Sequence, residues 1–570
     1  MTDWTWGPQP GPDGTRFRLW APGVEALTLV LEDDHPMTAT GDGWWEATAH
    51  APHGTPYAFR LPDGATVPDP AARAQKGDVH GPSRVVVPAH AWRHESPRRP
   101  WHEAVICEIH VGTFTPEGTF RAAAAKMPLL AEAGYTGVEI MPVAQFAGRR
   151  GWGYDGVLLY APHDAYGTPD DLRALVDAAH GAGLMIKLDV VYNHFGPDGN
   201  YLGAYAPDFF DPDRHTPWGQ GIHYDYPPVR RFVIENALYW LEEFRFDGLR
   251  LDAIDHIHDP SDPDVLVEAA REIRERVPHA WLATEDNRNV THLHERDGDR
   301  TPLMSGEWND DWHNAAHVVA TDEDEGYYAD WQDDPVGHLA RAAAEGFADQ
   351  GDRGRGRPSG HLPPDAFVDF LQNHDQIGNR AVGERLNQLT APARLEALQA
   401  MLLLSPHVPL LFMGEEWGAT EPFLFFTDFH GELGDAVREG RRREFEKFVG
   451  FAGAVPDPND PDTFRRSRID WTMRDTPDHR RALDRTRGLL KLRAERIAPM
   501  IPGTGPDAGR RLDAPKGTVA VDWRLGGGLL QLRACFAHHP EAVPPTVGEV
   551  IHRTGPAAGA PNSCVVAVAP

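Results

Sequence analysis

The stretch FDGLRLDAIDH, residues 246–256, decides the fold class because it starts as an apolar run and closes on polar residues. Three more stretches show the same pattern of an apolar run followed by polar residues: GLMIKLDVVYNH (183–194), AWLATED (280–286) and FVDFLQNHDQ (367–376). Strands buried on both faces are continuously apolar, and barrels of alternating strands and helices carry their chemistry at the strands' C-terminal ends. The pattern predicts a parallel barrel whose mouth is lined by the polar residues that close each run.

Two of those polar residues suit the cleavage of a glycosidic bond, which needs one carboxylic acid and one carboxylate. Arg250 lies two positions before Asp252, so both side chains point to one face of the strand, and the guanidinium favours the ionised carboxylate. Glu285 follows an apolar run at residues 281–283, a setting that raises a carboxyl pKa and keeps an acid protonated. Any one such residue is more often a helix cap or an ion-pair partner, but four strand ends with such groups together indicate catalysis.

The length of the chain predicts accessory domains beside the barrel. Its 570 residues exceed the ~250 of a typical single barrel. Residues 1–97 show short alternating strands separated by Gly, Pro and Asp, which predicts a β-sandwich, and residues 98–499 hold the barrel with loop insertions. Residues 500–570 lack a helical period and predict a small β-domain. The expected fold is therefore an α/β (β/α)8 TIM barrel with an N-terminal β-sandwich and a C-terminal β-domain.

Eight barrel strands are expected in order along the chain. The first two lie at 105–111 and 136–143, the next three close at Asp189, Asp252 and Glu285, a weak sixth lies near 303–307, the seventh ends near Asn373, and the eighth lies at 408–417. Helical patterns cover 169–182, 231–244 and 263–277, with Thr168 and Ser261 as candidate caps.

Composition excludes several partners. With 85 acidic against 55 basic residues, the formal charge of −30 opposes nucleic-acid binding. No segment approaches the ~20 apolar residues of a membrane helix, and no signal peptide is evident, so we expect a cytoplasmic protein without a membrane partner. None of the 29 histidines pairs with Cys or Glu at the spacing of a zinc site, so neither a metal nor a cofactor is expected.

The four stretches resemble the signature regions of the α-amylase clan, glycoside hydrolase family 13, whose members are built on a (β/α)8 barrel and retain anomeric configuration. This resemblance implies that Asp252 is the nucleophile, Glu285 the acid/base, and Asp375 the carboxylate that stabilises the transition state by gripping sugar hydroxyls. It also implies a set of groups that line the same sugar subsite: Tyr154 as an aromatic platform, His194, Arg250 and His374.

Two further implications of the resemblance concern ions and glucan. Many clan members hold calcium through the residue that matches Asn193 together with a long insertion, but the insertion at 195–226 is short, which argues against such a site. The phrases FRLWAP (17–22) and VPDPAARAQ (67–75) resemble the N-terminal sandwich of glycogen branching and debranching enzymes. That domain either binds glucan or braces the barrel, and the lack of an exposed aromatic pair favours bracing.

Clan members hydrolyse, transfer or isomerise with the same carboxylates, so the reaction depends on acceptor-side loops. The runs GEWNDDWHNAAH (306–317), MGEEWGATEPFLFFTDF (413–429) and VPDPNDPDTFRRSRIDW (455–471) resemble the maltooligosyltrehalose trehalohydrolases. This implies cleavage of the α-1,4 bond next to the α,α-trehalose cap of maltooligosyl trehalose, and functional pairing with a maltooligosyl trehalose synthase. The candidate acceptor-side residues are Asp255, His256, Glu416, Trp417, Phe425 and Phe426.

Two alternatives remain open at this point. A 1,4-α-glucan branching enzyme has a similar N-terminal sandwich and a similar GEEWG-like run at 414–418, but transfers the glycosyl group to a sugar instead of water. A glucan-binding protein without catalysis would share the fold, although it would have no need for Asp252, Glu285 and Asp375 together.

Overall fold

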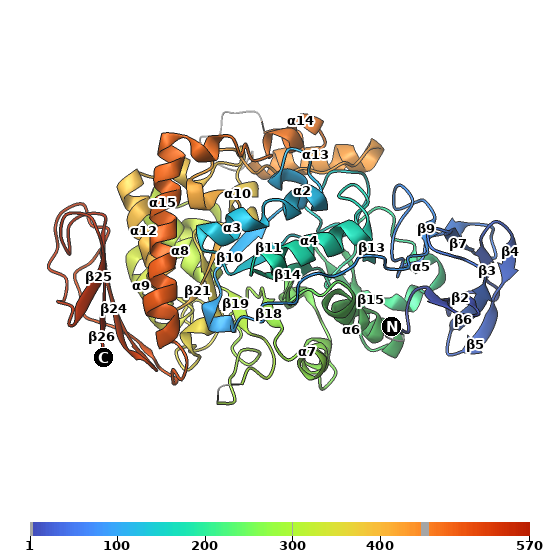
Figure 1. Cartoon of the computed structure of the whole chain (residues 1–570), viewed down its shortest axis with the longest axis horizontal. Coiled ribbons are helices and arrows are strands. Elements are labelled where there is room, and N and C mark those ends of the chain that lie inside the picture. The colour runs from blue at the N-terminus through green and yellow to red at the C-terminus, as the bar shows by residue number, and fades with distance from the viewer. Residues whose placement is uncertain (1–3, 299, 446–454) are drawn as a thin grey trace.

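The computed structural model describes residues 4–298, 300–445 and 455–570. A barrel occupies the centre of the molecule, an N-terminal pair of sheets lies at one end, and a C-terminal sheet lies at the other (Figure 1). The barrel therefore separates the two accessory regions.

Eight parallel strands close the barrel, as predicted, and the last strand pairs with the first. In order, they are β10 (Ile106–Ile109), β11 (Gly137–Ile140), β14 (Met185–Val190), β17 (Gly248–Leu251), β18 (Trp281–Thr284), β19 (Gly306–Trp308), β20 (Phe367–Phe370) and β21 (Val408–Phe412). Every residue of these strands is buried, and most are apolar. Six of the eight strands also carry a buried charged residue, among them Arg250 of β17. The weak sixth strand begins slightly later than expected.

Helices surround the barrel. The longer ones are α3 (Met127–Ala133), α4 (Pro169–Gly181), α6 (Pro227–Glu243), α7 (Val265–Arg276), α8 (Asp310–Thr321), α9 (Pro335–Glu345), α12 (Pro392–Leu404), α13 (Gly431–Phe445) and α15 (Pro477–Leu492). Short helices lie in the connections: α1 (Val111–Phe114), α2 (Phe120–Ala124), α5 (Leu202–Tyr205), α10 (His374–Gly378), α11 (Leu386–Leu389) and α14 (Pro461–Arg466). Two hairpins extend from the barrel: β12 (Ala144–Gln145) with β13 (Leu158–Pro162), and β15 (Phe210–Thr216) with β16 (Gly219–Ile222).

One of the two predicted helix caps is confirmed. Thr168 accepts a hydrogen bond from the Asp171 backbone N–H and forms a capping box at the start of α4. Ser261 does not cap α7. Asp264 immediately precedes that helix and accepts from the Val267 N–H, while the Ser261 hydroxyl donates to Asp259 at 2.5 Å. The expected cap was placed too early because the helix begins only after Pro263.

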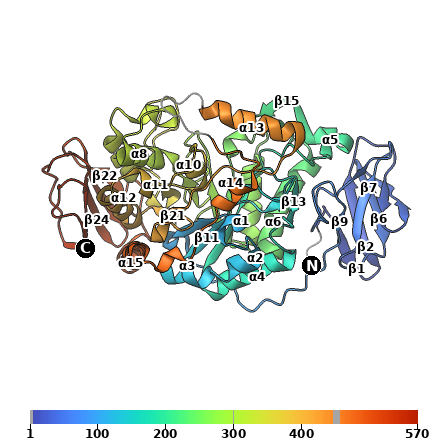
Figure 2. The same cartoon turned by 90° about the horizontal axis from the view of Figure 1, so that it is seen from above.

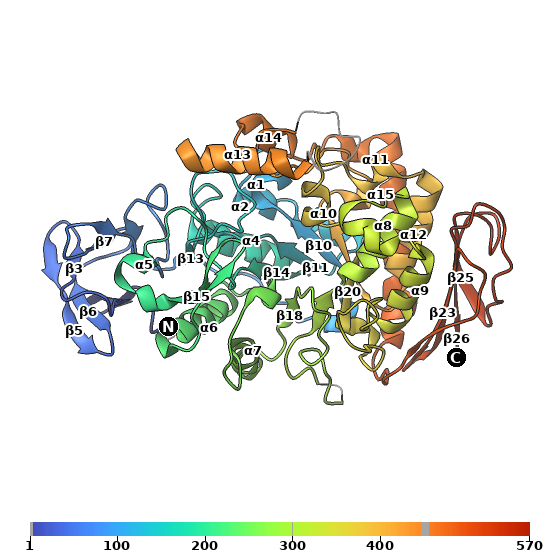
Figure 3. The same ribbon diagram turned by 180° about the vertical axis from the view of Figure 1, so that it is seen from behind.

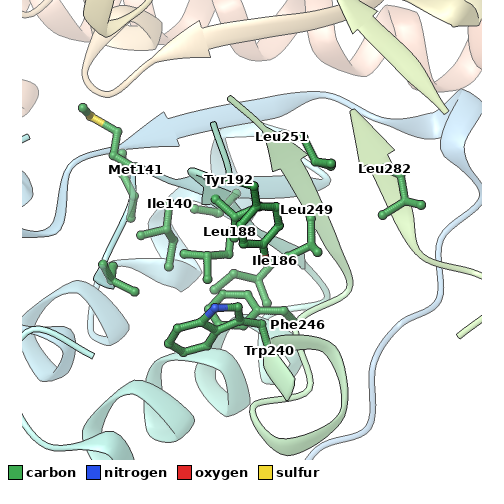
Figure 4. Close-up of a cluster of buried hydrophobic side chains, with 14 of the residues drawn as sticks. Ile140, Met141, Ile186, Leu188, Tyr192, Trp240, Phe246, Leu249, Leu251 and Leu282 are labelled. Atoms are coloured by element: carbon green, nitrogen blue, oxygen red, sulfur yellow. The ribbon is translucent and has the colours of Figure 1, made fainter. Parts of the chain in front are cut away.

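The core between strands and helices is aliphatic and aromatic. Ile186 and Leu188 of β14 and Leu249 of β17 face the cluster that contains Trp240 of α6 (Figure 4). These side chains are almost fully inaccessible to solvent. Truncating such a residue to Ala costs about 2–5 kcal/mol, so the cluster fixes the strands whose ends carry the polar residues described below.

The N-terminal region is a sandwich of two antiparallel sheets. One sheet has the order β1-β2-β6-β5 and the other β4-β3-β7-β8, with β9 added to β7. The strands are β1 (Gln9–Gly11), β2 (Gly14–Trp20), β3 (Thr28–Val30), β4 (Asp34–Pro36), β5 (Thr38–Gly41), β6 (Trp44–Ala49), β7 (Pro56–Arg60), β8 (Thr66–Val67) and β9 (Ser83–Arg84). Figure 2 shows both sheets beyond α5 at one end of the molecule.

Buried aromatic contacts join the N-terminal region to the barrel. The indole of Trp6 packs edge-on against Phe232 of α6, with 4.9 Å between ring centroids, and donates to the Pro228 carbonyl at 3.1 Å. The guanidinium of Arg73 lies 4.7 Å from the Tyr160 ring and 4.4 Å from the Tyr239 ring. These contacts support a bracing role for the sandwich.

The C-terminal region is one antiparallel sheet of order β22-β23-β24-β26-β25. Its strands are β22 (Gly509–Arg511), β23 (Thr518–Leu525), β24 (Gly528–Cys535), β25 (Glu549–Thr554) and β26 (Ser563–Ala569). From behind, α9 and α12 lie between this sheet and the barrel (Figure 3). Trp523 of β23 is fully buried and donates its indole N–H to the Ala343 carbonyl of α9 at 3.0 Å.

The proposed domain boundaries fall outside the helices and strands that form the core. The boundary at 97/98 lies in the irregular segment between β9 and β10, and the boundary at 499/500 lies within the short turn η9 (Ala498–Met500). Within the described ranges, no helix is both long and apolar enough to cross a bilayer.

Candidate active site

Consecutive barrel strands deliver the predicted site residues to one end of the barrel. The register pairs Asp189 of β14 with Arg250 of β17, and Arg250 with Ala283 of β18. Asp252 follows the end of β17, and Glu285 follows the end of β18. Because all strands are parallel, their C-terminal ends meet on one face, which is where function lies in this architecture.

Arg250 is the central cation of the site and is fully buried. Its Nη1 lies 2.7 Å from Asp189 Oδ2 and 2.8 Å from Asp252 Oδ1, and its Nη2 lies 2.5 Å from Glu285 Oε2. The guanidinium also lies 4.2 Å from the Trp308 ring centroid. Burial by itself lowers the pKa of Arg250, but the carboxylates of Asp189 and Glu285 outweigh it and raise the pKa above its ordinary value. One fixed positive charge therefore orients three carboxyl groups.

The orientation of Asp252 is fixed from two sides. Arg250 donates to Oδ1, and the Asn193 side-chain amide donates to Oδ2 at 3.0 Å. The next residue, Ala253, adopts a left-handed conformation with φ of 39°, and its N–H donates to Glu285 Oε2 at 3.0 Å. The turn after β17 thus ties the two carboxyl groups to each other.

Glu285 has the properties of a protonated acid. Burial raises its pKa well above the usual value, Arg250 opposes this rise, and the neighbouring Asp252 and Asp375 add to it. Because Oε2 accepts hydrogen bonds from Arg250 and from the Ala253 N–H, Oε1 is the oxygen left to carry the proton. The apolar setting expected from residues 281–283 is confirmed, since all three are buried.

His374 links Asp375 to the barrel wall. Its Nδ1 lies 2.5 Å from Glu108 Oε1, and its Nε2 lies 3.4 Å from Asp375 Oδ2. Burial alone lowers the pKa of His374, but Asp375 and Glu108 outweigh it and raise the pKa to about 9. The imidazolium therefore stays charged at neutral pH and holds Asp375 at the mouth of the barrel.

Tyr154 and His194 form one wall of the site. The Tyr154 hydroxyl donates to Asp189 Oδ2 at 2.7 Å, and its ring stacks on His374 with an interplanar angle of 20°. His194 Nε2 lies 3.0 Å from the Tyr154 carbonyl oxygen. Trp218, which connects β15 to β16, stacks on His194 at 4.5 Å yet keeps 44% of its surface exposed. An exposed indole beside the carboxyl groups is available to contact a sugar.

A pocket of about 370 Å³ adjoins this wall and contains the predicted acceptor-side residues Asp255 and His256. It is bounded by Asn193, which holds Asp252, and by the β15–β16 hairpin. The Oδ1 atom of Asp255 is buried without a hydrogen-bond partner, and burial raises the pKa of this carboxyl group. Because Asp255 lines the pocket, its carboxyl group is placed to accept a hydrogen bond from a ligand hydroxyl there.

Comparisons with known proteins give the family. The family described as Alpha amylase, catalytic domain, matches residues 65–206 and 219–475, and Carbohydrate-binding module 48 (Isoamylase N-terminal domain) matches residues 5–90. The chain is 45% identical over 504 residues to a malto-oligosyltrehalose trehalohydrolase of Deinococcus radiodurans, covering 86% of this chain and 82% of that one. A malto-oligosyltrehalose trehalohydrolase of Arthrobacter ramosus is 37% identical over 94% of this chain and 95% of its own.

The chain belongs to the malto-oligosyltrehalose trehalohydrolase family, within the α-amylase clan. A solved Salmonella typhimurium protein described as an alpha amylase superposes over the full length of both chains, with a TM-score of 0.96 and 52% identity. A 1,4-alpha-glucan branching enzyme of Mycolicibacterium paratuberculosis is 35% identical, but only over 42% of this chain and 37% of its own. The trehalohydrolases thus match the whole architecture, whereas the branching enzyme matches part of it.

Two predicted acceptor-side residues of this trehalohydrolase-family chain do not reach the pocket. Glu416 is buried and accepts a hydrogen bond from the Tyr135 hydroxyl at 3.2 Å. Trp417 is fully inaccessible and packs against Trp471 and His479. Both lie on the turn η6 (Glu415–Trp417), which folds back against α15 after β21. Their predicted role in substrate contact is therefore corrected to packing.

The two phenylalanines that were predicted beside them lie in different surroundings. Phe426 is fully buried and packs at 5.2 Å from His110 and 5.0 Å from Phe464, so it also belongs to the core. Phe425 is half-buried and lies edge-on to Trp152 at 5.2 Å, and Trp152 contacts His374. Phe425 is therefore the member of this pair that lies nearer the site.

Three residues of the site escaped the sequence analysis: Glu108, Trp218 and Asp310. Asp310 is the first residue of α8, directly after β19 and its cap Asn309. Burial raises its pKa to about 7, with further contributions from Asp375 and Asp311, and Asp310 in turn raises the pKa of Glu285. Asp310 lies in the run 306–317, which was noted only for its family resemblance, and the strand before it was the weakest of the eight in the sequence.

The side chain that clan relatives use for calcium is already engaged. The Asn193 amide nitrogen donates to the Asp252 carboxylate at 3.0 Å and to the Asp252 carbonyl at 2.8 Å, and its Oδ1 contacts His194 Nδ1. In the ranges that the structure describes, no group of three or more His, Cys, Asp and Glu residues is arranged to hold a metal ion.

Proposed function

We propose that this chain hydrolyses the α-1,4 bond next to the terminal α,α-trehalose unit of maltooligosyl trehalose and releases trehalose and a maltooligosaccharide. The observation that carries the proposal is the pair Asp252 and Glu285, which differ in environment while both bind one arginine. Burial raises the pKa of Glu285, as the acid requires, while Asp252 is held at both carboxylate oxygens, as suits a nucleophile. Full-length similarity to trehalohydrolases supports the choice of substrate.

The geometry supports a double-displacement reaction. Glu285 donates the proton on Oε1 to the glycosidic oxygen, while Asp252, with both oxygens fixed by Arg250 and Asn193, attacks the anomeric carbon. Water then replaces the leaving sugar, and ionised Glu285 accepts its proton as the glycosyl–enzyme bond breaks. Anomeric configuration is retained because inversion occurs twice.

The acceptor side supports recognition of a 1,1-linked sugar pair. Trp218 offers an exposed ring face above His194, and His256 lies edge-on to the same indole at 5.1 Å. Asp255 lines the adjoining pocket, where a correctly placed trehalose hydroxyl would donate a hydrogen bond to its carboxyl group. An ordinary maltose end that leaves such a group unpaired forfeits about 1–3 kcal/mol, which corresponds to roughly a 5- to 150-fold preference.

Product analysis tests the proposal. The protein is incubated with maltotriosyl trehalose and separately with amylose, and the products are separated by chromatography. We expect free trehalose plus maltotriose, with amylose nearly unchanged. New α-1,6 branches in amylose without trehalose release would instead establish a branching enzyme. The variant Glu285→Gln serves as the control, and if it matched the wild type in either reaction, the acid assignment would be wrong.

A non-catalytic glucan-binding role would predict glucan binding without products in this assay. The organised carboxyl groups around Arg250 favour an enzyme over that alternative. The proposal includes a cytoplasmic location. It also includes a synthase that supplies the substrate, because the trehalose cap next to the cleaved bond exists only after another enzyme has formed the 1,1 linkage.

A further inference from the structure

A second pocket, of about 390 Å³, lies where α14 meets the segments around Gly118 and Arg150. It shares no lining residue with the carboxylate site or with the acceptor-side pocket. Its walls include Arg149, Arg150, Arg465 and Arg468, with Glu117 as the carboxyl-bearing residue among them. Pockets of ~300–1,000 Å³ are the usual size for small ligands.

The charge of this pocket is opposite to that of the chain, whose formal charge is −30. Arg150 pairs with Asp428, and Arg465 pairs with Asp462. Arg149 and Arg468, by contrast, form no ion pair within 4.0 Å with any residue that the structure describes. Two of the four guanidinium groups therefore lack a bound counter-charge, and like charges gathered in this way attract an anion.

Arg468 shows that a hydrogen-bonding partner is missing. Its guanidinium packs 5.0 Å from the Phe464 ring centroid, and its Nε is buried without a hydrogen-bond partner. Burial lowers the pKa of Arg468, and the neighbouring Arg465 lowers it further, whereas Glu117 opposes both. A negatively charged ligand in the pocket would stabilise the charged form of this guanidinium against burial and against Arg465.

We propose that this pocket binds a phosphate group, either as inorganic phosphate or as the phosphate of a small sugar. Guanidinium forks match tetrahedral phosphate oxygens in bidentate geometry, which a compact anion such as chloride cannot exploit. Arg149 and Arg468 supply the uncompensated charge, and Arg150 and Arg465 complete the wall.

The pocket is joined to the carboxylate site by one short segment of chain. Arg149 and Arg150 lead directly into Gly151, whose carbonyl accepts from His110 Nε2 at 3.0 Å, and into Trp152, which lies edge-on to His374 at 5.5 Å. Tyr154 follows two residues later. A phosphate held by the two arginines therefore contacts the segment that carries part of the catalytic wall.

Calorimetry on the whole protein tests the proposal. Inorganic phosphate and glucose 6-phosphate are titrated separately, in phosphate-free buffer at constant ionic strength. We expect saturable binding of at least one of them, and the tighter ligand identifies the source of the phosphate group. The double variant Arg149→Gln/Arg468→Gln should bind at least tenfold more weakly, while Glu117→Gln, which removes the opposing carboxylate, should bind several-fold more tightly.

The matched control is Arg480→Gln/Arg481→Gln, which removes the same charge from the exposed face of α15 and should leave the affinity unchanged. Circular dichroism and thermal melting verify that each variant is folded, and the tighter binding of Glu117→Gln does not depend on the double variant. The proposal is overturned if the wild type binds neither ligand saturably, or if the Arg149/Arg468 variant retains wild-type affinity.

Discussion

At the scale of single residues, activity depends on whether Glu285, which lies beside Arg250, carries a proton. Glu285 must be protonated to act as an acid, so activity is present below its pKa and is lost as the pH rises through it. Its pKa is raised by burial first and also by nearby carboxylates, among them Asp310. The raised value extends activity into a more alkaline range than an ordinary glutamic acid allows.

Asp310→Asn should therefore shift the alkaline limb of the kcat/KM profile to lower pH. Removing this negative charge makes ionisation of Glu285 easier, and we expect a shift of a few tenths of a pH unit. The pH–rate profile on maltotriosyl trehalose measures it. Asp322→Asn, at the exposed far end of α8, is the control and should leave the limb in place. An unchanged profile for Asp310→Asn would mean that Asp310 does not act on the acid.

The nucleophile has its own test at this scale. Asp252→Asn removes the attacking carboxylate but keeps the shape that Arg250 and Asn193 hold. We expect kcat to fall by at least ~10³-fold, since no covalent intermediate can form. Thermal melting should stay close to that of the wild type. A modest loss, below tenfold, would contradict the assignment.

At the scale of elements, the β15–β16 hairpin brings Trp218 to the mouth of the site. Trp218→Ala should raise KM for maltotriosyl trehalose by roughly tenfold, equivalent to about 1.4 kcal/mol of lost contact with the sugar, and should change kcat less. Trp218→Phe, which keeps a ring over His194, should recover most of the affinity. Steady-state kinetics measures both constants. Equal KM values for the Ala variant and the wild type would mean that the hairpin does not contact the sugar on the acceptor side.

The caps of the outer helices give a second prediction for elements. Asp264→Ala should destabilise the protein by about 1 kcal/mol because the Val267 N–H loses its partner. Ser261→Ala should cost less, since that hydroxyl is exposed and bonds only to the side chains of Asp259 and Arg230. Thermal melting of the two variants compares them, and the reverse order would restore Ser261 as the cap.

At the scale of the whole molecule, the N-terminal sandwich is fastened to the barrel through buried rings. Trp6→Ala removes an indole that is fully buried against Phe232 and Trp44. We expect a loss of about 3–5 kcal/mol and a lower melting temperature, with kcat at low temperature nearly unchanged. Trp45→Ala, a half-buried indole of the same sandwich, should cost less. Loss of kcat in a folded Trp6→Ala variant would mean that the domain does more than brace.

The sequence by itself determined the barrel and its strand order, and it predicted the trio Asp252, Glu285 and Asp375. It could do so because buried parallel strands are largely apolar and their ends are polar, so the information is local in the chain. The position of Arg250 on the same face as Asp252 was also predictable, since side chains alternate between the two faces of a strand. The weak sixth strand hid Asp310, because only three residues, Gly306–Trp308, form it.

Only the tertiary structure decided which loop residues reach the site. Glu416 and Trp417 follow a barrel strand just as Asp252 does, yet the turn that carries them folds back against α15 and buries both. Trp218 had no local signal, and it reaches His194 because the hairpin extends over the barrel mouth. The physical reason is the same in each case: the direction of a loop is set by packing against elements distant in sequence, and no local pattern of residues encodes it.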